Sequence, residues 1–268
     1  RQVEQWYGDK MNRPYRQRAQ CVAMAKTNAP GSHLNLVQMA QTETNHLWRA
    51  VSANMMQNYL HEPVVREELL HRLTDRHPLV RGNAVLSLEP LAQQNGREHI
   101  AITKLLEDPV RKVRIDAAWA LRRVIDTNSL AGRELLQYFR QTSDQPAGVM
   151  QQGVFQYDRR QPALAAEFFR RAGQWDTNTA APHHELAVAL SVQGRAEEAV
   201  NELRIACAKD PTQAGFRYRL GLGLGELGDL PGAKAAFEAA VKIDPTLADA
   251  WYNLGLALNS MDQPDEAI

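Results

Sequence analysis

Cysteine is scarce in this sequence, and its scarcity excludes several kinds of site. Only Cys21 and Cys207 occur among the 268 residues, and no C-x-x-C pair is present. The chain therefore lacks the spacing of a zinc cluster, a thioredoxin-like redox site or a haem-attachment motif. Cys207 stands among apolar residues of a helical pattern, which predicts a small buried thiol.

Long apolar runs and a net charge are also missing. No apolar run approaches the roughly 20 residues of a membrane-spanning helix, so no membrane span is predicted. Lys and Arg number 31, as do Asp and Glu, yet residues 1–145 carry 20 basic against 15 acidic residues and residues 146–268 carry 11 against 16. This asymmetry permits weak steering of a charged partner but does not by itself indicate nucleic acid.

Catalytic signatures are absent as well. The chain has no G-x-x-x-x-G-K-[ST] loop, no G-x-S-x-G elbow and no H-E-x-x-H pair among its eight histidines. The run GLGLGELG (221–228) has G-x-G-x-x-G spacing, but no strand precedes it, so a helix and its turn are predicted there. We expect surface or inter-hairpin histidines, with metal ligation as the alternative. The prediction is a non-enzyme with no catalytic residue, no cofactor and no metal site.

The second half contains a repeat of 34 residues instead. Its aligned sets are Gly153, Ala187, Gly221 and Gly255; Ala165, Ala199, Ala233 and Ala267; Phe169, Leu203 and Phe237; and Ala172, Ala206 and Ala240. Each period holds two amphipathic helical stretches. The W-x-x-L-G pattern at 251–255, and Pro211 and Pro245 after the second stretches, resemble the tetratricopeptide repeat family over about residues 146–268.

The repeat pattern has a direct packing interpretation. Small residues let the two helices of a hairpin approach closely, large ones fill the space between hairpins, and proline ends each second helix. One hairpin cannot bury its apolar face alone. Because the last unit stops one turn into its second helix, we expect a fragment of a longer protein, as we do from the absence of an initiator Met at Arg1. Self-association through the open C-terminal face is also expected.

Residues 1–145 show a different pattern with a 33-residue offset. DRHPLVRGNAVLSL (75–88) aligns with DPVRKVRIDAAWAL (108–121), and NHLWRAVSANMM (45–56) is a looser copy. A turn with Asp and Pro, followed by V-R-x-x-A-x-x-x-L, resembles the HEAT-like repeat. The resemblance implies three hairpins whose Asp and Arg side chains stack as a ladder, after an opening helix over 15–26. Pro63, Pro78 and Pro109 are expected in first helical turns.

A basic cluster in this half indicates an alternative function. A surface of this kind can hold phosphate backbones, and its binding would weaken markedly with salt. Interleaved acidic residues, and the match of Arg114 to the repeat's structural arginine, favour an ordinary solvated face. The cluster consists of Arg111, Lys112, Arg114, Arg122 and Arg123.

The tetratricopeptide resemblance also implies a binding groove, because the first helices of such hairpins line a concave surface. The predicted partner-binding residues are Met150, Tyr157, His184, Tyr218, Arg219, Tyr252 and Asn253. Tyr, Met and His bury apolar area and keep hydrogen-bonding options, which suits an extended peptide or a helix. The Lys and Asn clamp that some relatives use for a C-terminal carboxylate is absent here. The alternative is that these side chains pack only against a continuing superhelix or a segment of the same chain.

The order of the whole chain resembles the C-terminal part of a bacterial family in which a multihaem c-type cytochrome domain precedes HEAT-like and tetratricopeptide repeats. The resemblance is carried by WYGDKMNRPYRQRAQ (6–20), AKTNAPGSHLNLVQMAQTETNHLWRAV (25–51) and LHEPVV (60–65). No C-x-x-C-H occurs, so no haem-binding role transfers to any residue. The resemblance implies a periplasmic or otherwise extracytoplasmic scaffold that docks a redox partner or supports cytochrome assembly; the residues alone leave the compartment unknown.

Together these patterns predict an all-α, right-handed solenoid of helical hairpins. Residues 1–145 form HEAT-like repeats with a leading helix, and residues 146–268 form four tetratricopeptide units, the last incomplete. The expected function is a protein–protein interaction scaffold that binds a peptide or partner protein in the concave groove. The repeat tail of an electron-transfer cytochrome and nucleic-acid binding on the basic half are the alternatives.

Overall fold

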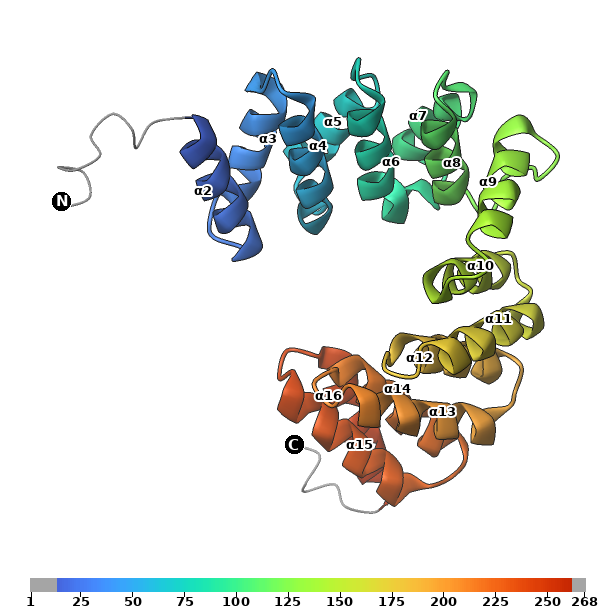
Figure 1. Ribbon diagram of the computed structural model, residues 1–268. Helices are drawn as coiled ribbons and strands as arrows, with labels where there is room; N and C mark the ends of the chain where they lie inside the picture. Colours follow the sequence, from blue (N-terminus) through green and yellow to red (C-terminus); the bar gives the residue numbers. More distant parts are fainter. Residues whose placement is uncertain (1–13, 262–268) are drawn as a thin grey trace, which may run out of the picture. The chain divides into compact units, whose positions relative to one another are not determined.

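Every regular element of residues 14–261, the part that the computed structural model describes, is a helix (Figure 1). The all-α prediction is therefore confirmed. The chain folds as two compact units, which meet in sequence between Tyr138 and Phe139. This boundary lies within helix α9 (Leu130–Gln141). The start of the last unit's second helix, predicted at 265–268, and most of the segment 6–20 lie outside the described residues.

The first unit is a row of helical hairpins (Figure 1). Its elements before α9 are α2 (Pro14–Lys26), α3 (Ser32–Thr42), α4 (His46–Met55), η2 (Met56–Tyr59), α5 (Pro63–Arg72), α6 (Pro78–Ala92), α7 (Arg97–Thr103), η3 (Lys104–Glu107) and α8 (Arg111–Ala120). The second helices α4, α6 and α8 contact one another in that order, and α3 contacts α5. One helix, α2, thus precedes the helix pairs α3–α4, α5–α6 and α7–α8.

Apolar residues at aligned positions of the 33-residue pattern are buried in both copies. Ala84 and Ala117 are completely buried, as are Val80 and Leu88. Where a polar side chain enters this core it is hydrogen-bonded, because an unpaired buried donor is costly: the hydroxyl of Ser87 donates to the carbonyl oxygen of Ala53 at 2.8 Å. The periodic apolar positions therefore form the contact between successive second helices.

One expected helix start is wrong. Pro63 and Pro78 begin α5 and α6, but Pro109 precedes α8, whose N-cap is Val110. The Asp108 carboxylate accepts the Val110 N–H at 2.8 Å. This two-residue turn places Pro109 inside the turn, so the helix begins only at Arg111.

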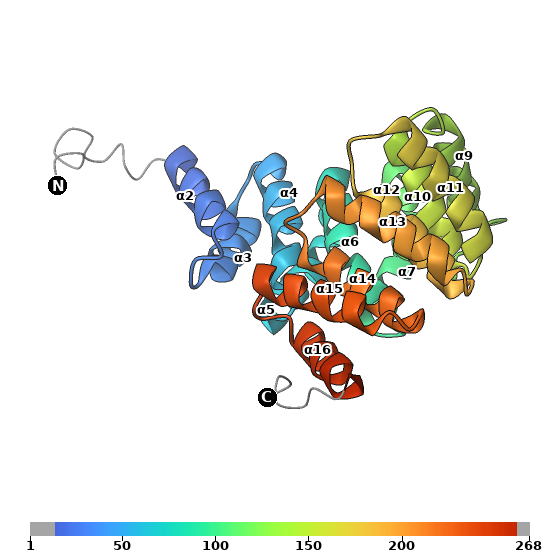
Figure 2. The same ribbon diagram turned by 90° about the horizontal axis from the view of Figure 1, so that it is seen from below.

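The second unit is also built from helical hairpins packed side by side (Figure 2). After the end of α9 it contains α10 (Pro146–Asp158), α11 (Pro162–Trp175), α12 (Ala181–Val192), α13 (Ala196–Lys209), α14 (Ala214–Glu226), α15 (Leu230–Ile243) and α16 (Ala248–Ser260). Each of the helices α10 to α16 contacts the next along the chain, and α14 also contacts α16. The turns recur too, since Arg160, Gly194 and Gly228 are 34 residues apart and all have positive φ, at 60°, 73° and 79°.

Gly153 and Gly221 are glycines because the two helices of their hairpins approach each other closely. A Cβ on Gly153 would lie 2.4 Å from the Phe169 ring, and one on Gly221 would lie 2.5 Å from the Phe237 ring. Both rings are buried. Phe169 and Phe237 thus each lie directly on a glycine of the first helix of their own hairpin, which brings the two backbones together.

Candidate protein-binding surface

The first helices of the second unit, α10, α12, α14 and α16, carry the predicted binding residues, and the structure divides these residues into two groups. Met150 and Tyr157 are half-buried and pack against the core around Phe169. His184 is also half-buried, with its ring centroid 4.8 Å from that of Phe216. These three side chains therefore support the packing of the hairpins as well as facing their surface.

The remaining predicted residues lie on α14 and α16. Tyr218 is half-buried, with its ring 6.0 Å from that of Phe237, and its hydroxyl accepts a 3.4 Å hydrogen bond from Asn253. Arg219 is exposed, and Tyr252 is 68% exposed, the most of any large apolar or aromatic side chain among the described residues. The free part of the predicted surface is thus at the C-terminal hairpins.

A pocket of about 230 Å³ lies at this point, between α14, α15 and α16. Its walls are Gly221, Leu222, Gly225, Leu230, Ala233, Phe237, Asn253, Leu256, Ala257 and Ser260. Leu222 and Leu256 remain 39% and 47% exposed. Exposed leucines around a concave apolar floor are characteristic of a surface that buries an apolar side chain of a partner.

Only Asn253 of the seven predicted residues lines this pocket. Leu222, Leu256 and Gly225 stand at repeat positions expected to line the groove, although they are not among the seven predicted residues. Leu222 and Leu256 occupy the same repeat position, 34 residues apart, and Gly225 stands where the other units have Tyr157, Ser191 and Asn259. Because glycine has no side chain, the pocket is open at this position, which carries a side chain in the other units.

Groups suited to chemistry are not gathered in the described part of the chain. Residues 14–261 contain no cluster of three or more His, Cys, Asp or Glu that could hold a metal ion. Cys21 and Cys207 are both buried free thiols, and burial raises the pKa of each. None of the helices in the same range is long and apolar enough to cross a membrane.

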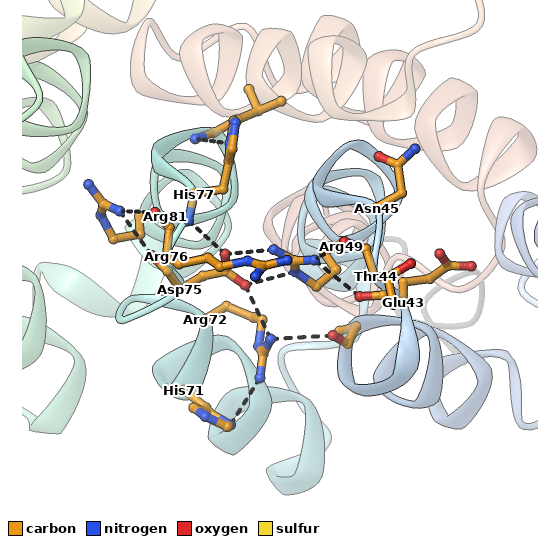
Figure 3. Close-up of polar contacts among 12 residues, drawn as sticks. Glu43, Thr44, Asn45, Arg49, His71, Arg72, Asp75, Arg76, His77 and Arg81 are labelled. Atoms are coloured by element: carbon orange, nitrogen blue, oxygen red, sulfur yellow. Dashed lines mark hydrogen bonds and ion pairs between the residues drawn. The ribbon is translucent and has the colours of Figure 1, made fainter.

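The arginines of the first unit form a ladder of ion pairs, and Figure 3 shows the rung between Arg49 and Asp75. Arg49 donates two hydrogen bonds to the carboxylate of Asp75, at 2.8 and 2.9 Å. Arg81 binds Asp108 in the same bidentate way at 2.7 and 2.8 Å. The third rung uses a glutamate, as Arg114 donates to Glu134 at 2.8 and 2.6 Å.

The predicted basic cluster is engaged in similar contacts. Arg111 lies 3.8 Å from Glu134, Lys112 pairs with Asp116, and Arg122 pairs with Glu89 at 2.6 Å while its guanidinium lies over the Trp119 ring. These carboxylate and ring partners engage Arg111, Lys112 and Arg122 within the fold. A phosphate backbone is not needed to explain them.

Comparison with known proteins identifies the repeat of the second unit. The family model of the TPR repeat matches residues 224–261, from the end of α14 to the end of α16. No curated protein matches the chain. Residues 224–261 therefore carry a tetratricopeptide repeat.

Several solved structures are similar to part of the chain. A crystal structure of MamA is 25% identical and covers 51% of this chain and 80% of its own, with a TM-score of 0.48. MamA from Desulfovibrio magneticus RS-1 is 18% identical over 65% of this chain and 91% of its own, with a TM-score of 0.48. The first TPR domain of Spaghetti (RPAP3), bound to the HSP90 peptide SRMEEVD, is 16% identical over 45% and 95%, with a TM-score of 0.43. The helices of the structure and the match of residues 224–261 to the TPR repeat model identify the fold.

Proposed function

We propose that the second unit is a protein-interaction module that holds a peptide segment of a partner along the first helices, with one apolar side chain in the pocket between α14, α15 and α16. The observation that carries this proposal is the pocket itself, open at Gly225 and flanked by the exposed Leu222 and Leu256. Its volume, about 230 Å³, is below the range of drug-sized ligand sites and suits one side chain. Exposed Tyr252 supplies a further aromatic contact on the same helix as Leu256.

The test begins with peptides selected from a displayed random library on the whole chain. Leu256→Ser should weaken the selected peptides about tenfold or more, because a buried leucine contributes about 1.5–3 kcal/mol. Leu164→Ser is the matched control, since Leu164 is an exposed leucine on the second helix α11. The affinity of Leu164→Ser should equal that of the parent.

A second variant fills the pocket. A Cβ on Gly225 would meet only Ala233, at 3.9 Å, so Gly225→Leu is accommodated by the backbone and projects into the opening. It should abolish binding while the helix content stays unchanged. Selected peptides that bind Leu256→Ser and Gly225→Leu as tightly as the parent would place the binding surface elsewhere.

A further inference from the structure

A second cleft, of about 220 Å³, lies in the first unit between α6 and α8. Its walls are mostly apolar and include Leu79, Leu86, Val110 and Val113, of which Leu79 is 42% exposed. The carboxylate of Asp116 lines the same cleft. A carboxylate in apolar surroundings is costly unless it is paired, so its partners decide what the cleft can bind.

Asp116 is buried because a glycine on the neighbouring helix leaves room for its side chain. Only 5% of the residue is exposed, although the aligned residue of the preceding hairpin, Asn83, is half-exposed and bonds to its own helix through Leu79. The space for the Asp116 side chain comes from Gly82 on α6. A Cβ at Gly82 would lie 2.7 Å from the Oδ2 atom of Asp116.

The two oxygens of this carboxylate differ in their contacts. Oδ1 pairs with the ammonium of Lys112, whose side chain is 68% exposed, so the cation lies at the rim rather than in the cleft. Oδ2 accepts no hydrogen bond from any residue of the described part of the chain. A carboxylate has about four acceptor sites, so most of its hydrogen-bonding capacity is unused.

The other polar groups at the cleft do not supply the missing donor. His77 Nδ1 already accepts the Leu79 N–H, and its ring stacks on His46 at 3.6 Å. Burial lowers the pKa of His77, as do the charges of His46, Arg49 and Arg81, against the opposing effect of Asp75. The nearby guanidinium of Arg81 is bound to Asp108.

We propose that this cleft binds one arginine side chain of a partner protein, whose guanidinium pairs with both oxygens of Asp116 while its methylene stem lies on Leu79, Leu86, Val110 and Val113. A planar guanidinium matches a carboxylate in bidentate geometry, and a long aliphatic stem buries apolar surface below a charged head. The volume accommodates one such side chain. The site is separate from the pocket of the second unit and does not depend on its function.

The test uses acetyl-arginine amide as the probe and acetyl-citrulline amide as its neutral isostere. In the whole chain, the methyl NMR signals of Leu79, Leu86, Val110 and Val113 should shift saturably with the arginine probe, with Kd on the order of millimolar. The citrulline probe should give no saturable shift. Equal shifts with both probes would overturn the proposal, and this comparison does not depend on any variant folding.

Variants separate the carboxylate from general charge. Asp116→Asn should weaken the arginine probe at least tenfold, whereas Glu107→Gln, which removes an exposed carboxylate of the same unit, should leave it unchanged. Lys112→Met should tighten binding several-fold because it removes the competing ammonium and keeps the stem. Equal losses in Asp116→Asn and Glu107→Gln, or a loss in Lys112→Met, would contradict the site.

A final comparison identifies the source of the guanidinium. Free L-arginine carries α-amino and α-carboxylate charges that a residue within a protein lacks. The blocked probe should bind at least as well as the free amino acid. Tenfold tighter binding of free L-arginine would show a small-molecule site and overturn the assignment to a partner protein.

Discussion

Asp75 and Asp108 illustrate how single residues connect the hairpins of the first unit. Each carboxylate accepts an N–H two residues later, from His77 or Val110, and binds the arginine of the preceding hairpin. Burial raises the pKa of both carboxyls, but the arginine and backbone hydrogen bonds and the neighbouring guanidinium charges outweigh it, and each pKa is lowered. The arginine also holds carbonyl oxygens of its own turn, as Arg81 does with Asp75 at 2.9 Å. One residue pair thus fixes two turns.

Removal of one member of such a pair should be costly. Arg81→Ala leaves the Asp108 carboxylate, whose side chain is 4% exposed, without its main partner. We expect a loss of about 3 kcal/mol in the free energy of unfolding, because breaking a buried ion pair strands a charge. Urea unfolding followed by circular dichroism measures this loss.

The matched control for Arg81→Ala is Arg97→Ala. Arg97 also binds a carboxylate, that of Glu67, at 2.6 Å, but both side chains are largely exposed at 71% and 58%. Exposed pairs contribute little, so the urea midpoint should barely move. Equal shifts for the two variants would mean that burial does not determine the strength of the ladder.

Helix α14 shows at the level of an element why small residues recur. Gly221 and Gly225 lie one turn apart on this helix, yet only Gly221 faces the Phe237 ring closely. The 34-residue period predicted a small residue at Gly221. The period did not predict the opening of the pocket at Gly225, because that opening depends on the side chains of α15 and α16.

The two glycines should respond oppositely to alanine. Gly221→Ala places a Cβ 2.5 Å from the Phe237 ring, and we expect it to destabilise by about 1–3 kcal/mol through overpacking. Gly225→Ala adds only an ordinary contact and should stabilise by about 0.5–1 kcal/mol, since alanine favours a helix interior. Thermal unfolding of both variants measures the difference. The same sign of change in both would show that Phe237 does not lie on Gly221.

The two units differ at the level of the whole molecule in where charge is buried. Among the described residues, the charged residues that are buried as a whole all belong to the first unit: Arg49, Glu68, Arg81, Asp108, Asp116 and Arg122. The core of the second unit is built from alanine, leucine, valine and phenylalanine, with a buried cysteine and closely packed glycines.

The resemblances to HEAT-like repeats and to cytochrome-associated repeat regions stay predictions, as do self-association and nucleic-acid binding.

Acid should therefore destabilise the first unit before the second. Hydrogen bonds from Arg18 and Arg114 lower the pKa of Glu43 and Glu134, and the pKa values of Asp75 and Asp108 are lowered as well. A lowered carboxyl pKa stabilises the fold fully above the unfolded-state pKa of about 4, and this stabilisation is lost as the pH falls through the folded-state value. The raised pKa of Asp116, caused by burial, acts in the opposite direction at one site only.

Hydrogen exchange measured by mass spectrometry tests this expectation when intrinsic rates are corrected for pH. Between about pH 5 and pH 3, peptides from α4, α6 and α8 should lose protection while those from α12 to α15 keep it. If the second unit lost protection first, the expectation that acid destabilises the first unit before the second would be wrong.

Periodicity in the sequence was enough to predict the helices, the hairpins and the residues that share a register, because burial must recur wherever identical helices stack. It predicted Gly153 and Gly221 as close contacts and aligned Arg81 with Arg114, while the ladder was implied by the resemblance to HEAT-like repeats. It did not locate the pocket at Gly225, the start of α8 after Pro109, or the burial of Asp116. Those features depend on which side chain of a neighbouring helix occupies or vacates a given space, and that is decided only when residues about 30 positions apart are packed together.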